Sequence, residues 1–143
     1  NKRTELVEHH KREICFPGGV QEPQDADHWA TALRETQEEM GIEPQDVDVL
    51  GELDPVSTRT DFLIRPVVGI FPYPYPFRVN SAEIAQVLQV PVAALLDARN
   101  VRTESRLRPE GLEHSTSYVY QRHLIYGATA RILAQLLAIW REL

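Results

Sequence analysis

The stretch Ala32-Leu-Arg-Glu-Thr-Gln-Glu-Glu-Met-Gly-Ile42 decides the fold. It belongs to a run of strong helix formers that predicts a helix over residues 25–40, ended by a glycine. At about 100° per residue, Glu35, Glu38 and Glu39 fall within one arc of this helix, and apolar side chains gather on the opposite side. The helix therefore presents a row of carboxylates on a face that packing can hold rigid.

These three glutamates favour a site for a divalent cation. Like charges at such spacings repel one another by about 0.2–0.5 kcal/mol per exposed pair, and a bound ion would offset that repulsion. Hard cations such as Mg²⁺ and Mn²⁺ prefer carboxylate oxygens, and no matching set of Cys and His accompanies the glutamates. An ordinary solvated acidic face would give the same pattern, so the glutamates alone leave both interpretations open.

A second feature lies one predicted strand upstream. The segment Phe16-Pro-Gly-Gly19 is a tight turn whose glycines allow the backbone to approach a ligand phosphate closely. Arg34 can steady a neighbouring carboxylate through a fork-like hydrogen bond. Asp25 and Asp27 are expected to face solvent or to cap the helix rather than to bind metal, since Asp is a preferred N-cap.

Outward from this helix, the chain reads as strands between two helices. β-branched and aromatic residues indicate the strands, and apolar residues at helical spacing indicate the second helix. The predicted strands span 13–16, 46–53, 62–71, 86–90, 101–107 and 115–121, and the second helix spans 128–140. The last two strands form a predicted hairpin, and the proline-rich residues 71–77 are expected to be a loop or sheet edge. This order is typical of a mixed α/β fold.

Length and composition limit the class of protein. A chain of 143 residues with 43% hydrophobic residues suits one domain over residues 1–143. With 15 basic and 21 acidic residues its net charge is −6, which argues against nucleic acid as a partner. The most apolar stretch, 125–140, is shorter than the roughly 20 residues that span a bilayer, so we expect no membrane anchor.

The single cysteine and the first residue bear on the setting of the protein. Cys15 cannot form an internal disulfide, which is typical of a reducing compartment, and we expect a cytoplasmic protein. We expect Cys15 to be a small apolar group and not a nucleophile. Because the chain opens at Asn1 without an initiator methionine, a truncated amino terminus stays open.

The glycines and glutamates together resemble a known family. Gly18-Gly19 followed by the pattern Arg-Glu-x-x-Glu-Glu-x-Gly-Ile over residues 34–42 resembles the Nudix box of hydrolases that cleave nucleoside diphosphates linked to another group. Thr36 stands where an aliphatic residue is usual, and Gly19 lies one residue farther from Arg34 than is common. Both departures resemble the coenzyme A pyrophosphatase-like branch, as does Thr-Ala-Leu-Arg-Glu at residues 31–35.

The resemblance to that branch extends over most of the chain. The matching segments are Arg3 and His10 before the glycine turn, then 51–56, 65–69, 81–84 with 90–91, and 126–133. Glu8 and Arg12 depart from it, because the branch usually has a basic residue and a glycine there. Tyr126 stands where Trp is common. A reversed charge at position 8 bears on the substrate more than on the type of reaction.

The resemblance implies a Nudix-type α/β/α sandwich with a mixed β-sheet between helices, and metal-dependent hydrolysis of a pyrophosphate bond. By resemblance, Glu35 and Glu39 are the principal ligands of Mg²⁺ or Mn²⁺, and Glu38 is a further direct or water-mediated one. Glu83 is the candidate general base, because the family often places an acidic residue in that loop. A glutamate favoured by a helix dipole would look the same at that position.

The substrate contacts are predicted from the turn and from cationic side chains. Gly18 and Gly19 are expected beside the substrate phosphates. The cationic candidates are Arg3 and Arg65, with Arg59 and Arg78 as further ones and His9 and His10 as less favoured ones. A plain surface role is the alternative for each. We expect Trp29 and Trp140 to lie in the core and not to stack on a ligand.

Three hypotheses follow. The first is a hydrolase of the pyrophosphate bond of coenzyme A or its derivatives, giving 3′,5′-ADP and 4′-phosphopantetheine. The second keeps the reaction and takes another small-molecule nucleoside diphosphate derivative, such as ADP-ribose. The third is a non-catalytic module that binds a nucleotide or a partner. A homodimer stays open in all three.

Overall fold

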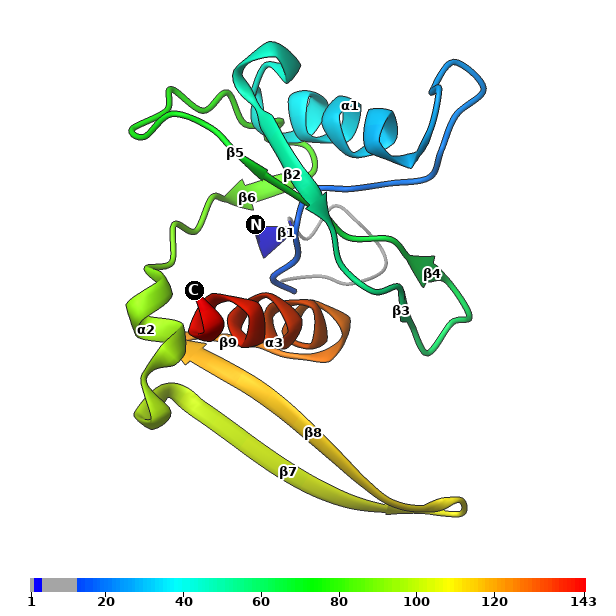
Figure 1. Cartoon of the computed structure of the whole chain (residues 1–143), viewed down its shortest axis with the longest axis vertical. Helices are drawn as coiled ribbons and strands as arrows, with labels where there is room; N and C mark the ends of the chain where they lie inside the picture. The colour runs from blue at the N-terminus through cyan, green and yellow to red at the C-terminus, as the bar shows by residue number, and fades with distance from the viewer. Residues whose placement is uncertain (1, 4–12) are drawn as a thin grey trace. The chain divides into compact units, whose positions relative to one another are not determined.

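The computed structural model describes residues 2–3 and 13–143, and the chain folds into two compact units (Figure 1). The first unit contains the described residues up to 54 together with 65–88, and the second contains 55–64 together with 89–143. Helices and strands occur in both, which confirms the predicted α/β class. In the described parts of the chain, each strand pair is antiparallel.

The first unit holds the predicted acidic helix. Its elements are β1 (Lys2–Arg3), α1 (His28–Met40), a 3₁₀ turn η1 (Pro44–Asp46), β2 (Asp48–Glu52), β5 (Val67–Ile70) and β6 (Ile84–Gln86). Strand β1 pairs with β6, and β2 pairs with β5, with an irregular register between Val49 and Gly51. Of the predicted strand at 13–16, only a single bridge at Ile14 forms.

Helix α1 begins and ends at residues with clear capping chemistry. The side chain of Asp27 accepts a hydrogen bond of 2.8 Å from the backbone N–H of Ala30, so the predicted cap is confirmed at this residue. The helix starts three residues later than expected because the cap stands at 27. Gly41 ends it in the left-handed region at φ 71°, and its N–H donates to the carbonyl of Gln37 at 2.9 Å.

The buried side of α1 differs from the side predicted. Thr31, Glu39 and Met40 are buried, whereas Trp29 is 36% exposed. The prediction that Trp29 lies in the core is therefore wrong. Its indole Nε1 donates to Glu52 Oε2 at 3.1 Å, which gives the polar end of the ring a partner at the surface.

The predicted strand over 62–71 is broken in two. Proline has no N–H to give to a ladder, and Pro66 separates β4 (Leu63–Ile64) from β5. Strand β4 pairs with β3 (Val56–Ser57) in the second unit, and β5 pairs with β2 in the first. A single predicted strand therefore contributes to both units.

The second unit packs helices on a β-ladder. Its remaining elements are α2 (Val92–Leu96), a 3₁₀ turn η2 (Ala98–Asn100), β7 (Val101–Arg108), β8 (Gly111–Tyr120), β9 (His123–Ile125) and α3 (Gly127–Glu142). Helices α2 and α3 contact β8 and each other (Figure 1). The buried apolar side chains are Val56, Leu95, Tyr118, Ile125, Ala130, Ile132, Leu133 and Leu137. Trp140 is about half exposed, which corrects its predicted place in the core.

The predicted hairpin is confirmed and is longer than expected. The pairing of β7 with β8 runs from Val101 opposite Tyr118 to Arg108 opposite Gly111. Gly111 closes the turn at φ 132°, a conformation that favours glycine.

No helix in the part of the chain that the structure describes is long and apolar enough to cross a membrane.

The proline-rich residues 71–77 form a loop, as predicted. The rings of Phe71, Tyr75 and Phe77 contact one another. The hydroxyl of Tyr75 donates to Asp46 Oδ2 at 2.6 Å and accepts from the N–H of Glu43 at 3.0 Å. The loop is thus fixed to the segment that follows α1.

Candidate active site

The glycine turn lies against the acidic side of α1. The N–H of Gly18 donates to Glu39 Oε2 at 2.9 Å. A Cβ added at Gly19 would lie 2.2 Å from Glu35 Oε1, so glycine lets that carboxylate lie directly against the turn. Glu39 is 4% exposed, an unusual position for a charged residue that lacks a function. The structure thus brings Gly18 and Gly19 together with Glu35 and Glu39.

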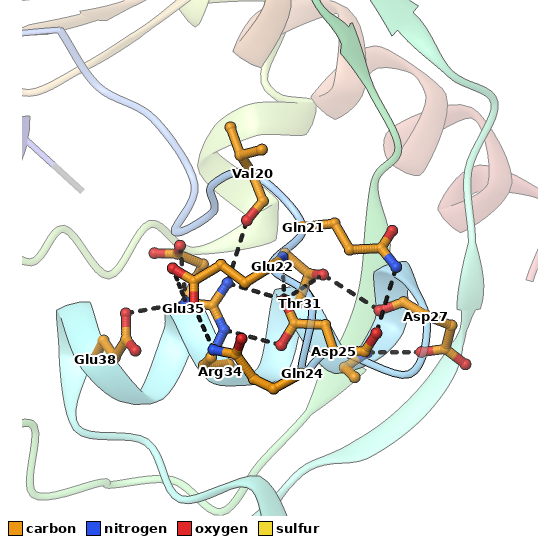
Figure 2. A network of polar contacts seen from close by, with 11 residues as sticks. Val20, Gln21, Glu22, Gln24, Asp25, Asp27, Thr31, Arg34, Glu35 and Glu38 are labelled. Atoms are coloured by element: carbon orange, nitrogen blue, oxygen red, sulfur yellow. Dashed lines mark hydrogen bonds and ion pairs between the residues drawn. The ribbon is translucent and has the colours of Figure 1, made fainter.

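Arg34 is the centre of the polar network beside this turn (Figure 2). It donates two parallel hydrogen bonds to Asp25, from Nε to Oδ1 at 2.9 Å and from Nη2 to Oδ2 at 3.0 Å. Its Nη2 also donates to the carbonyl of Val20 at 3.2 Å. Asp25 accepts further bonds from the N–H of Glu22 at 2.9 Å and from Thr31 Oγ1 at 3.0 Å. The guanidinium of Arg34 therefore holds the segment before α1 through Val20 and Asp25.

The same guanidinium reaches two glutamates of the row. Nη1 of Arg34 donates to Glu35 Oε1 and to Glu38 Oε2, each at 3.2 Å (Figure 2). The side chain of Glu38 is 57% exposed, whereas that of Glu35 is 16% exposed. Arg34 thus steadies a half-buried carboxylate and an exposed one together, as the sequence suggests for this residue. The positive charge of Arg34 also offsets part of the repulsion between these glutamates, which a bound cation would offset as well.

Asp25 differs from its predicted place. It neither faces solvent nor caps the helix, because its side chain is 4% exposed and is turned to Arg34. The hydrogen bonds from Arg34, and then that from the backbone of Glu22, hold the pKa of Asp25 well below its usual range. The pKa of Arg34 is raised in turn, chiefly by its hydrogen bond to Asp25. Both partners are charged, and the pair is a charge-assisted fork.

Glu35 has the opposite electrostatic setting. Burial raises its pKa above the usual value, and the neighbouring carboxylates of Glu38 and Glu83 raise it further, against the opposing effect of Arg34. Because the largest effect on this pKa is desolvation of the charged form, added positive charge at this place would stabilise the ionised Glu35. A carboxylate shifted in this way next to a glycine turn is a candidate functional group.

The segment that leads to Glu83 crosses the end of α1. The N–H of Arg78 donates to the carbonyl of Met40 at 2.9 Å, and that of Asn80 donates to the carbonyl of Glu39 at 3.0 Å. A Cβ added at Gly41 would lie 2.6 Å from Arg78 Cβ and 2.8 Å from its backbone N. Glycine at this position therefore permits the close crossing as well as the turn that ends the helix.

The donor chemistry of this cluster suits a hard divalent cation, because all its candidate ligands are carboxylates. Glu35, Glu38 and Glu39 are the residues that would hold such an ion. In the described residues, however, no three His, Cys, Asp or Glu side chains are gathered in a group that could hold a metal ion. The carboxylates of Glu35 and Glu38 face Arg34, and that of Glu39 faces Gly18. Two features of this cluster therefore fit a divalent cation. They are the carboxylate ligands and the close approach of Gly19 to Glu35.

Arg65 acts electrostatically on Glu52. It is exposed, and its charge contributes to lowering the pKa of Glu52, after the larger effects of hydrogen bonds from His28 and Trp29. The imidazole of His28 is paired with Glu52. Arg3 lies in β1, and its side chain falls outside the described part of the structure.

Of the other cationic candidates, Arg78 has an ion-pair partner and Arg59 lies in the second unit. Arg78 pairs with Glu43 at 2.6 Å. In the second unit, Arg59 lines a cavity of about 600 Å³ together with Arg108 and Glu113. The predicted contacts or departures at Glu8, His9, His10 and Arg12 lie outside the described residues.

The sequence does not reveal two features of the site. The fork between Asp25 and Arg34 joins residues nine positions apart through a turn, and no helical or strand period reveals such a pair. The crossing of Arg78 and Asn80 over the helix end joins residues about 40 positions apart. The one signal for it is Gly41, which helix capping alone already explains.

Comparison with known proteins adds independent information. Residues 2–110 match the family model described as the NUDIX domain. A protein of Photorhabdus laumondii named "Uncharacterized Nudix hydrolase NudL" is 38% identical over 136 residues, which cover 94% of this chain and 72% of the relative. Relatives of the same name in Cronobacter sakazakii and Salmonella paratyphi B are 36% and 37% identical, over 94% and 89% of this chain and 70% and 66% of their own lengths.

Proposed function

This chain belongs to the Nudix family of pyrophosphohydrolases, and from this premise we propose that it cleaves the pyrophosphate bond of coenzyme A or its derivatives to 3′,5′-ADP and 4′-phosphopantetheine. The observation that carries the reaction is the glycine turn, Gly18 and Gly19, set against Glu35 and Glu39. Support for the substrate comes from the sequence, where the extra residue between Gly19 and Arg34 and the segment 31–35 resemble the coenzyme A branch.

Nudix hydrolases generally use divalent metal ions, and we propose Mg²⁺ or Mn²⁺ for this chain. When bound, such an ion neutralises phosphoryl oxygens and lowers the pKa of a coordinated water. Glu35, Glu38 and Glu39 would hold it. The role of Arg34 is to keep two of these carboxylates in place, and the role of Asp25 is to orient Arg34.

The remaining groups serve the substrate and the proton. In this proposal, Gly18 and Gly19 let the backbone lie against the substrate phosphates, and Arg3 and Arg65 contact the substrate. Glu83 acts as the general base and takes the proton of the attacking water. Its effect on the pKa of Glu35 supports a place close to the glutamate row. A carboxylate in this role needs no strong basicity when the water is already acidified.

One observation favours a second substrate. Glu8 and Arg12 depart from the upstream pattern of the coenzyme A branch, and a negative charge at position 8 changes what that segment can bind. ADP-ribose is the alternative. The idea of a non-catalytic module is set aside, because the chain belongs to a hydrolase family and keeps all three glutamates of the box.

The test is a separation of products. Wild-type protein with Mg²⁺ or Mn²⁺ is incubated with coenzyme A, an acyl thioester of it, and ADP-ribose, and kcat/KM is measured for each. We expect the highest value for coenzyme A or its thioester, with 3′,5′-ADP among the products. Good turnover of ADP-ribose without turnover of coenzyme A would overturn the proposed substrate. The proposed type of reaction would still stand.

Two controls address the site itself. Glu39→Gln keeps an oxygen that can accept from Gly18 N–H, so the fold should persist while turnover disappears. A chelator should abolish wild-type activity, and added Mg²⁺ or Mn²⁺ should restore it. Activity that survives both treatments would contradict the metal site at the glutamate row.

The domain organisation, the location and the partner of the protein belong to the same proposal. We propose a single domain over residues 1–143, since the family match at 2–110 includes parts of both units. We propose a cytoplasmic location from the cysteine usage and a small molecule, not a nucleic acid, as the partner. A homodimer stays open, and light scattering in solution decides it.

A further inference from the structure

The turn that carries Glu83 is anchored to α1 through its first residue. The N–H of Asn80 donates to the carbonyl of Glu39 at 3.0 Å. This carbonyl belongs to the last turn of the helix, where carbonyls have no partner inside the helix. The bond therefore satisfies a group that the helix itself cannot, and it fixes the start of the turn to a residue of the glutamate row.

The same asparagine builds the turn that follows. Its side-chain Oδ1 accepts from the N–H of Ala82 at 3.2 Å. Its carbonyl accepts from the N–H of Glu83 at 3.0 Å and from that of Ile84 at 2.8 Å. Asn favours turns because its side-chain oxygen can accept a hydrogen bond from the backbone N–H two residues later. Asn80 thus accepts bonds from the last two residues of the turn and from the first residue of β6.

The far side of the turn is fixed as well. Ile84 is 2% exposed and starts β6, which pairs with β1. Glu83 lies between this buried residue and the bond from Asn80 to Glu39, and it is partly exposed. Its backbone therefore has little freedom, and its carboxylate extends from a held position.

We propose that Asn80 is a positioning residue, which holds Glu83 at the end of the glutamate row by joining the turn of residues 80–83 to the backbone of Glu39. The inference rests on the proposed function, in which Glu83 is the general base. It adds a residue outside the Nudix box that sets the geometry between the base and the glutamate row.

The test compares kcat and KM for five proteins with the best substrate of the panel. They are wild type, Asn80→Ala, Asn80→Ser, Glu83→Gln and the double variant Asn80→Ala/Glu83→Gln. Asn80→Ala removes the side-chain acceptor and keeps the backbone bonds. We expect kcat to fall roughly 10- to 100-fold with KM little changed, because misplacing a group by about 1 Å is enough for such losses. Asn80→Ser retains a neutral acceptor and should recover most of the loss.

The double variant separates positioning from a merely structural role. If Asn80 acts through Glu83, then Asn80→Ala has no further effect once Glu83 is Gln, and the two losses do not add. Losses that multiply would overturn the inference, as would a wild-type kcat in Asn80→Ala or in Glu83→Gln. Thermal melting of each variant shows whether it is folded.

Asn80→Gln serves if Asn80→Ala does not fold. It keeps the amide and places its oxygen one methylene farther out, so the turn keeps a polar residue while the acceptor is displaced. We expect a lower kcat for it, and an unchanged kcat would contradict the inference. Suppose that chelation inhibits the wild type and Glu39→Gln abolishes activity, while the Asn80 variants keep full kcat. That result overturns only the role of Asn80. A wild type that hydrolyses no diphosphate overturns the proposed function and this inference together.

Discussion

Asp25 and Arg34 face each other through two hydrogen bonds of 2.9 and 3.0 Å, and the same guanidinium continues to Glu35 and Glu38. The fork fixes the plane of the guanidinium, because both bonds must be made at once. The position of Glu35 therefore depends on a residue that lies before the helix begins.

Asp25→Asn should lower activity by weakening this fork. The amide has the same size but lacks the charge and one acceptor, so Arg34 loses its orientation. We expect kcat/KM to fall roughly 10- to 100-fold, the range typical of residues that orient metal ligands. Asp27→Asn is the matched control, since Asn is an equally good N-cap and should leave kcat/KM near wild type. Equal losses in the two variants would contradict a specific role for Asp25.

The fork also predicts how stability depends on pH. The pKa of Asp25 is lowered in the folded state, so the unfolded state binds the proton more readily. The stabilisation is complete above the ordinary carboxylate pKa of about 4 and is lost as the pH falls below it. The difference in Tm between wild type and Asp25→Asn should thus be constant from pH 7 to about pH 5 and shrink towards pH 3. A difference that stays the same at pH 3 would speak against a charged Asp25.

Gly19→Ala should impair activity while leaving the fold intact. The new Cβ would lie 2.2 Å from Glu35 Oε1, which is the mobile end of a side chain and can move away. We expect the free energy of unfolding to change by no more than about 0.5 kcal/mol, and kcat/KM to fall on the order of 100-fold. At Gly18 an added Cβ meets nothing within 4 Å, so Gly18→Ala should lose less activity. Kinetics and denaturant unfolding of both variants check this order.

Gly41→Ala should be destabilising, in contrast to Gly19→Ala. Its Cβ would meet the Cβ and backbone of Arg78, which cannot move aside cheaply, at a backbone φ of 71°. Overpacking of this kind costs about 1–3 kcal/mol beyond the strain of the left-handed backbone. Gly127→Ala isolates that strain, because φ is 64° there and nothing lies within 4 Å of the added Cβ. Urea unfolding should show a clearly larger loss for Gly41→Ala, and equal losses would contradict the close crossing.

The parts of the fold that local patterns encode are predicted well. Helix α1, its glycine end and the β7–β8 hairpin follow from periodicity, capping and a turn sequence within a few residues. Helix α2 and strand β9 are missed because five and three residues are too short to show a period. The break at Pro66 shows that composition marks an extended stretch but not how its two halves pair.

The site divides in the same way. The sequence brings out the glutamates and glycines because their spacing is local, but it gives no measure of what covers each side chain. Glu39 is therefore predicted on an acidic face and found buried, and Trp29 is predicted in the core and found at the surface. The partners of Arg34 depend on the path of the turn before α1, and that path is a property of the folded chain.

The crossing of Arg78 and Asn80 over the end of α1 limits how far the box can be treated as a portable module. A graft of residues 16–42 into another scaffold would transfer the glutamates and the glycine turn. It would leave behind the two amides that satisfy the carbonyls of Glu39 and Met40, and with them the loop of Glu83. A design that uses this motif therefore also needs a second segment, distant in sequence, whose backbone packs on the helix end beside Gly41.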